Sequence, residues 1–302
     1  MTASRAARPS FRPQDREARQ RARRRRKTVH NALTALSYAG LTLVALMFLF
    51  PFFWMVTNTI RPNAEVLAVP PTLLPGEYAW GTFAKAWNEL PFGQFFINSF
   101  IVAGSVTVIT VLVSTLSAYA FARLRFPGRG GLLMTYLATL MIPQVMLVIP
   151  LFLIVSRTGL TNTYLGMILP MAFSSFGAFL LRQFFLSIPK ELEEAALIDG
   201  ASRLRILVSI IVPVSLPAIG LLSLFTFIGQ WNNFLWPLIV VDDTAHATLP
   251  LGLTMFQTQQ GTSWNFIMAG ATLSMLPGIV LAVGLQQLIY RGISMSSGFG
   301  GR

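Results

Sequence analysis

The chain has 302 residues, of which 54% are hydrophobic and 11% are charged, and it carries a formal net charge of +12. Soluble domains contain roughly 25% charged residues, so this composition excludes an ordinary soluble domain and indicates a chain whose apolar surface faces lipid or partner subunits. Cysteine is absent, which excludes a disulfide framework and a thiolate metal site.

The positive charge is concentrated near the amino terminus, where 11 of the 23 basic residues lie between Arg5 and Lys27. Blocks of like charge are usually solvated and disordered. A block that ends directly before an apolar helix sets membrane topology and contacts anionic lipids more often than it binds nucleic acid. We therefore predict a disordered cytoplasmic tail over residues 1–35 and no nucleic-acid partner. The apolar run that follows is too long for a cleaved signal peptide, so we expect the first helix to be retained.

Six apolar segments follow this tail. A helix rises about 1.5 Å per residue, so about 20 apolar residues cross roughly 30 Å of hydrocarbon. The expected spans are 36–57, 97–121, 132–155, 164–181, 214–240 and 266–289. Prolines interrupt several of them, which membrane bundles tolerate where neighbouring helices or cavity water satisfy the freed backbone groups. The sequence therefore predicts an all-α membrane protein with six transmembrane helices in one domain, residues 36–290.

The distribution of basic residues orients these helices. With the amino terminus in the cytoplasm, 20 of the 23 lysines and arginines fall on the cytoplasmic side, and only Arg61, Lys85 and Arg157 fall outside. Basic residues that flank membrane helices are retained in the cytoplasm. Both termini are therefore predicted to be cytoplasmic, with a short carboxyl-terminal tail over residues 291–302.

A transporter of this composition must take its energy from another polypeptide. The six expected spans contain no Asp, Glu, Lys, Arg or His, whereas ion-driven carriers usually keep ionisable residues at that depth. Sodium sites built from backbone carbonyls stay open as an alternative. A phosphate-binding loop needs Gly-x-x-x-x-Gly-Lys-Ser/Thr, and none of the three lysines, Lys27, Lys85 and Lys190, follows a glycine. We therefore expect no enzymatic activity, no cofactor and no metal site.

Residues 187–212 form the only strongly polar segment between two expected spans. Pro189 precedes a short helix that is rich in acids at its start, as the helix dipole favours, and Gly200 stands where a left-handed cap would end that helix. A helix, a sharp turn and a second helix would make a rigid protrusion for a partner subunit. The alternative is a surface loop whose acids offset Arg203 and Arg205. The residues expected to contact the partner are Glu194, Ala195, Ala196, Asp199 and Gly200.

The same segment carries a family resemblance. Glu194-Ala195-Ala196, three residues, Gly200, nine residues, Ile210, one residue and Val212-Pro213 resemble the Glu-Ala-Ala-x3-Gly-x9-Ile-x-Leu-Pro signature of ABC importer permeases. Val212 replaces the leucine of that signature. The stretches "SAYAFARLRFPGRG", "LTNTYLGMILP" and "QWNNFLWPL" are similar to the shorter permease of the binding-protein-dependent carbohydrate uptake family.

The resemblance implies the type I importer fold and a subunit of an ATP-driven sugar importer in the cytoplasmic membrane of a bacterium. It also implies partners: a second permease, two ATPase subunits that receive the 194–200 helix, and an extracytoplasmic solute-binding protein. A permease for another solute, such as glycerol phosphate, a polyamine or a peptide, stays open, and a secondary carrier is a more remote alternative. The sequence does not name the sugar.

Two polar groups are candidates for contact with substrate or binding protein. Amides inside a membrane need partners, and tryptophan faces stack on sugar rings, so a polar patch in the fifth span can line a pathway; interhelical hydrogen bonding and an interfacial aromatic belt are the alternative. The resemblance places the external loop over 255–264 near the binding protein, although an ordinary hydrated loop would look similar. The pathway candidates are Gln230, Trp231, Asn232, Asn233 and Trp236, and the loop candidates are Gln257, Gln259, Gln260 and Trp264.

Overall fold

The computed structural model describes residues 13–258 and 261–299 of the chain. These residues form helices and one hairpin of two short strands, β1 (Gln257–Thr258) and β2 (Gly261–Thr262), which pair antiparallel. The chain divides into two compact units, residues 1–55 and 56–302.

The first unit is dominated by helix α1, Pro13–Thr59, which runs on into the second unit's first residues. Its part from His30 to Thr59 is long and apolar enough to cross a membrane. The helix begins upstream of the expected span and takes in residues 13–35, for which the sequence predicted a disordered tail. Residues 16–26 consist entirely of Arg, Ala, Gln and Glu, which are all good helix formers. Residues 1–12 of that tail lie outside the described residues.

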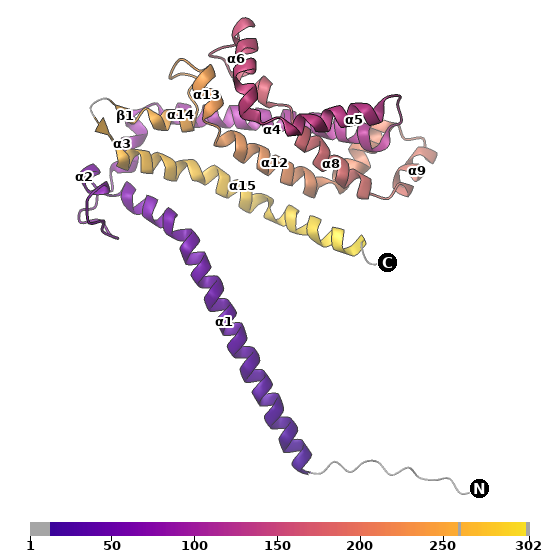
Figure 1. Cartoon of the computed structure of the whole chain (residues 1–302), viewed down its shortest axis with the longest axis horizontal. Helices are drawn as coiled ribbons and strands as arrows, with labels where there is room; N and C mark the ends of the chain where they lie inside the picture. The colour runs from indigo at the N-terminus through magenta and orange to yellow at the C-terminus, as the bar shows by residue number, and fades with distance from the viewer. Residues whose placement is uncertain (1–12, 259–260, 300–302) are drawn as a thin grey trace. The chain divides into compact units, whose positions relative to one another are not determined.

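The second unit contains the remaining helices (Figure 1). Its first half consists of α2 (Asn63–Val66), α3 (Thr82–Glu89), α4 (Phe92–Arg123), α5 (Arg129–Ala138), η1 (Thr139–Met141), η2 (Gln144–Leu147), α6 (Val148–Arg157), α7 (Tyr164–Ile168) and η3 (Leu169–Met171). Its second half consists of α8 (Ser175–Ser187), α9 (Glu191–Ile198), α10 (Arg203–Ile206), η4 (Leu207–Ile211), α11 (Val212–Val214), α12 (Leu216–Trp231), α13 (Leu235–Val240), α14 (Leu249–Thr254) and α15 (Trp264–Phe299).

The helices reach the expected number of spans only if bent pairs are counted as single spans. Three helices are long and apolar enough by themselves, in α1, α4 and α15. Three pairs qualify together: 129–141 with 144–157, bent by 94°, 164–171 with 175–187, bent by 46°, and 203–214 with 216–231, bent by 77°. By length and composition the described residues therefore hold three spans, or up to six.

One of these bends, and the break between α12 and α13, have a clear local cause. Proline disfavours the helical conformation in the residue before it, and Ile142 is extended (φ −87°, ψ 116°) directly before Pro143, where the 94° bend lies. The span expected over 214–240 is interrupted at residues 232–234, between α12 and α13. There the amide of Asn232 donates to the carbonyl of Ile228 at 3.0 Å, and the backbone N–H of Trp236 donates to Asn233. Such local amide bonds compete with a continuing helix.

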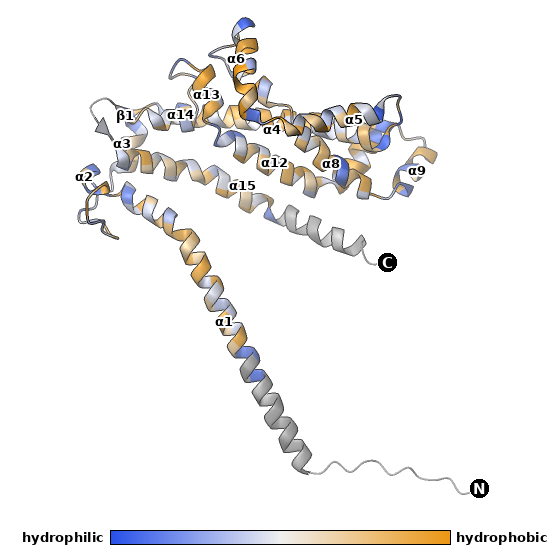
Figure 2. Ribbon diagram, in the orientation of Figure 1, coloured by the Kyte–Doolittle hydropathy of each residue, from blue (hydrophilic) through white to orange (hydrophobic). Residues whose placement is uncertain are grey.

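Helix α4 lies at the centre of the second unit and packs against both α8 and α12. The approach is close because small residues face α4: a Cβ atom at Gly177 of α8 would lie 2.6 Å from the hydroxyl of Ser114. Many large apolar side chains remain exposed elsewhere, including Met141 at 84% and Ile149 at 72%. Figure 2 shows hydrophobic stretches along the long helices and hydrophilic residues near α9. Such faces suit lipid or partner subunits.

Candidate functional site

The predicted protrusion is present as a hairpin of two short helices, α9 and α10, with a tight turn at residues 199–202. Gly200 has φ +79°, in the left-handed region that glycine adopts without strain. The N–H of Ala201 donates to the carbonyl of Ala196 at 2.9 Å, which closes the helix end. The hydroxyl of Ser202 accepts from the N–H of Arg205 and begins α10.

The hairpin presents the residues that the sequence singled out. Glu194, Ala195, Asp199 and Gly200 are exposed, while Ala196 is half-buried and packs against the cluster formed by α4 and α8. Apolar side chains lie between the acids: the exposed residues of this kind on α9 are Leu192, Leu197 and Ile198, the last at 87%. The exposed surface of α9 therefore combines an apolar tip with flanking carboxylates.

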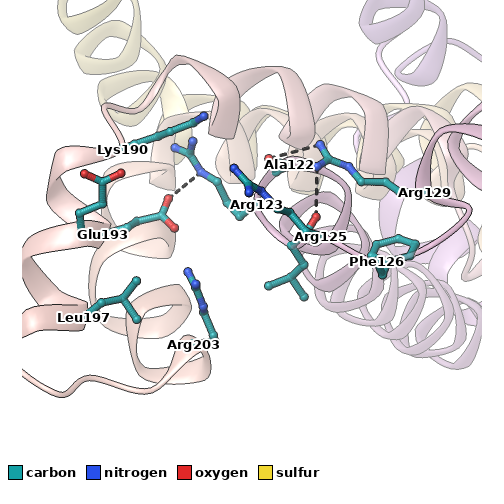
Figure 3. Close-up of a pocket in the computed structure, with 11 residues that line it drawn as sticks. Ala122, Arg123, Arg125, Phe126, Arg129, Lys190, Glu193, Leu197 and Arg203 are labelled. Carbon is teal, nitrogen blue, oxygen red and sulfur yellow. Dashed lines mark hydrogen bonds and ion pairs between the residues drawn. The ribbon is translucent and has the colours of Figure 1, made fainter.

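One residue pair at the base of the hairpin did not emerge from the sequence. Glu193 of α9 is buried, and its carboxylate lies 2.6 Å from Nε of Arg123, in the last turn of α4 (Figure 3). The side chains are only 6% and 3% exposed. The same guanidinium donates from Nη2 to the carbonyls of Phe185 and Ile188, both at 2.7 Å. Arg123 therefore joins the end of α4 to the end of α8 and the start of α9.

A cavity of about 640 Å³ opens beside this pair. Most of its charged lining residues are cations, as Figure 3 shows: Arg123, Arg125, Arg129, Lys190 and Arg203, against Glu193 and Glu194. Arg129 donates to the carbonyl of Leu124 at 3.1 Å and thereby caps the end of α4. The stretch "SAYAFARLRFPGRG" thus supplies the arginines that close α4.

All of the pathway candidates except Trp231 border a second cavity, of about 370 Å³, at the break between α12 and α13. Its described lining residues include four amides and no charged side chain. These amides are Gln144, Gln230, Asn232 and Asn233. Gln144 belongs to η2, directly after the 94° bend, and was not among the sequence candidates because the bend that turns it toward α12 is not visible in the hydropathy pattern.

The two tryptophans of the pathway group have structural partners. Trp231 is 3% exposed, donates from Nε1 to the carbonyl of Ser274 at 2.9 Å, and stacks on Phe227 with ring centroids 5.6 Å apart. Trp236 is 2% exposed and donates from Nε1 to the carbonyl of Gly166 at 3.2 Å. Their indole faces are covered by protein, in keeping with the interhelical alternative, and the amides remain as the accessible polar groups.

The external loop candidates are only partly described. Gln257 is exposed on β1, and Trp264 is half-buried at the start of α15. Gln259 and Gln260 lie outside the described residues. The β1–β2 hairpin is anchored to α2, because the amide of Asn63 donates to the carbonyl of Thr262 at 3.1 Å.

A polar network closes the same end of the second unit around Asn98, which is fully buried. Its amide donates to the carbonyls of Ala245 and Ala247, both at 2.8 Å. In the same loop, hydrogen bonds from the Asn162 side chain and from the backbone N–H of His246 lower the pKa of Asp243. Because the pKa is lowered, the carboxylate supports this loop above the usual carboxyl pKa, and the support is lost as pH falls through the lowered value.

These features define a class: an integral membrane subunit with a protruding helical hairpin and an amide-lined cavity at a helix break. Residues 110–295 match the family described as the inner membrane component of binding-protein-dependent transport systems. The chain belongs to this family, and it is a permease subunit of an ABC importer rather than an enzyme.

Relatives agree with that family, and a solved structure has a similar fold. The sn-glycerol-3-phosphate transport system permease protein UgpE of Pectobacterium atrosepticum is 36% identical over 269 residues, which cover 86% of this chain and 96% of the relative. The protein of the same name from Escherichia coli O1:K1 / APEC is 35% identical over 269 residues, which again cover 86% of this chain and 96% of the relative. In fold, the chain is similar to a chain of a bacterial ABC transporter that imports the acidic polysaccharide alginate, with a TM-score of 0.74 and 22% identity over 92% of this chain and 99% of that one.

Proposed function

We propose that this permease forms, together with a second permease, the membrane pathway for an uncharged, hydroxyl-rich solute of the sugar or oligosaccharide class. The observation that carries the proposal is the cavity at the α12–α13 break, whose polar side chains are amides. An amide both donates and accepts hydrogen bonds and so suits a sugar hydroxyl. An ion that leaves water needs an opposite charge, and none of the described lining residues supplies one.

The α9–α10 hairpin supports a further part of this proposal, that a separate ATPase subunit drives transport. Its exposed carboxylates and apolar tip suit a cleft on a separate ATPase subunit, and two permeases would present two hairpins to a two-subunit motor. An extracytoplasmic binding protein would deliver the solute near β1 and β2, where Gln257 is exposed. The alginate transporter was solved in complex with a pentasaccharide-bound periplasmic protein, which motivates this assignment.

A second candidate solute is glycerol phosphate, favoured by relatives of that name at 34–36% identity. A phosphate group would require cations along the route. Because the amide cavity of this chain contributes none, the partner permease would have to supply them. A neutral solute therefore needs only hydrogen-bonding groups in the cavity, whereas glycerol phosphate also needs cations from the partner permease.

Uptake into proteoliposomes that contain the whole transporter separates the two solutes. We expect a neutral oligosaccharide to be transported and sn-glycerol 3-phosphate neither to be transported nor to compete. Asn232→Leu should lower the kcat/KM for uptake about tenfold, since a hydrogen bond to a polar ligand contributes about 1 kcal/mol and the unpaired hydroxyl adds to the loss.

Asn88→Leu is the matched control for this substitution. Both amides are exposed, and both donate to the carbonyl four residues earlier, Asn88 to Ala84 and Asn232 to Ile228. The control should transport normally. Preferential uptake of glycerol phosphate, or an equal effect of the two substitutions, would contradict the assignment of the cavity to a neutral solute.

The proposed orientation has six spans and both termini in the cytoplasm. Single introduced cysteines can test it, because the natural chain has no cysteine that would react in the background. A cysteine at Thr244, exposed between α13 and α14, should react with a membrane-impermeant thiol reagent in intact cells. A cysteine at Ser187, exposed at the end of α8, should react only after the cells are permeabilised. Labelling of Ser187→Cys in intact cells would show that the orientation is the reverse of the one proposed.

A further inference from the structure

Helix α4 contacts both arms of the α9–α10 hairpin through one face of its last two turns. Arg123 reaches Glu193 at the start of α9, and Tyr119, one turn earlier on the same face, is 5% exposed. Tyr119 belongs to the same buried cluster as Ile206, the last residue of α10. The α9 arm of the hairpin is thus fixed to α4 by an ion pair, and the α10 arm packs against α4 in an apolar cluster.

The opposite half of α4 contacts the helix that ends at the amide cavity. Phe96 and Phe100 pack edge-on against the indole of Trp231, with centroids 5.2 and 6.4 Å apart. Trp231 is the last residue of α12, and the chain leaves the helix at Asn232. No proline interrupts α4 between these contacts and Arg123, a length of roughly 35 Å at the usual helical rise.

A buried ion pair at this place needs a reason other than stability. Removing two charges from water costs several kcal/mol, and apolar side chains of similar volume often stabilise a core as well or better. Arg123 fixes the positions of neighbouring helices, because one planar guanidinium binds the Glu193 carboxylate and two carbonyls at the end of α8.

We propose that Arg123 and Glu193 are positioning residues that tether the hairpin to α4, so that displacement of the hairpin is transmitted along α4 to the break at Asn232. This inference rests on the proposed docking of the hairpin to an ATPase. Neither residue contacts the solute in this arrangement. Their role is to make α4 move with the hairpin.

The test is a double-mutant cycle in the assembled transporter, read as solute transported per ATP hydrolysed. Arg123→Met or Glu193→Leu alone leaves one buried charge without its partner and should reduce assembly. The double variant, Arg123→Met with Glu193→Leu, buries no charge and should assemble with the ATPase as the natural chain does. Its transport per ATP should nevertheless fall at least about fivefold, the lower end of usual coupling between sites.

Arg129→Met is the matched control, because Arg129 also lies at the end of α4 and lines the same cavity but bonds only to carbonyls of residues 121, 122 and 124. Its transport per ATP should stay within about twofold of the natural value, below the fivefold threshold set for coupling. A double variant that transports with the natural stoichiometry, or one that fails to assemble, would overturn the tether, as would an equal loss in the control. Absence of ATPase from the natural complex would instead overturn the docking on which the inference rests.

Discussion

Uptake should be nearly abolished when Gly200 is replaced by valine, while the protein still inserts into the membrane. Gly200 has φ +79°, and a β-branched residue in the left-handed region costs at least roughly 1–2 kcal/mol and tends to open the turn. The open turn would separate α9 from α10 and misplace the exposed face of α9. The measurement is uptake together with copurification of the ATPase, both compared with the amount of permease in the membrane.

Glu194→Lys should give the same loss by a different route. Glu194 is one of two acids that border the predominantly cationic cavity, so a lysine there adds like charge beside Lys190 and Arg203 and removes a carboxylate from the docking surface. Two controls isolate the hairpin. Gly130→Val changes a glycine of α5 with open space around its Cβ position, and Glu89→Lys reverses an exposed acid on α3. Normal uptake by both hairpin variants would show that the hairpin does not couple to the motor.

Gly252→Ala should reduce the yield of folded permease more than any conservative change on the surface. A Cβ atom at Gly252 would overlap the ring of Phe95, which is fully buried where α14 packs on α4. Neither group can withdraw, because Asn98 and Ser99 of α4 bond to Ala247 and Leu249 beside them. Overpacking of a dense core costs about 1–3 kcal/mol. Thermal unfolding of the purified protein in detergent, followed by size-exclusion chromatography, measures the effect.

Gly104→Ala is the control for this prediction, since Gly104 lies inside α4 with nothing within 4 Å of its Cβ position. Alanine is favoured over glycine inside a helix by roughly 0.5–1 kcal/mol, so this variant should be as stable as the natural protein or more so. Adding Phe95→Leu to Gly252→Ala should recover part of the loss by making room. Equal stability of the Gly104 and Gly252 variants would refute the close packing of α14 on α4.

The sequence by itself determined the features that depend on local chemistry. Long apolar runs without charge predicted membrane helices. Among the described residues, three helices are long and apolar enough to cross a membrane, or up to six spans if each bent pair is one span. Pro189, the acids after it and Gly200 predicted a short helix closed by a left-handed glycine, and α9 ends in that way. These predictions succeeded because hydropathy, helix dipoles and the conformational freedom of glycine act within a few residues.

The features that only the tertiary structure decided join residues distant in the chain. Arg123 and Glu193 are 70 positions apart, and no periodicity in either segment indicates that a guanidinium at the end of α4 meets a carboxylate at the start of α9. The tryptophans of "QWNNFLWPL" could have faced a pathway or a core, and bonds to the carbonyls of Ser274 and Gly166 place them in the core. Gln144 lies beside Asn232 because the chain bends by 94° near Pro143. Hydropathy indicates which segments are buried away from water, but the tertiary packing of the helices determines which residues each side chain contacts.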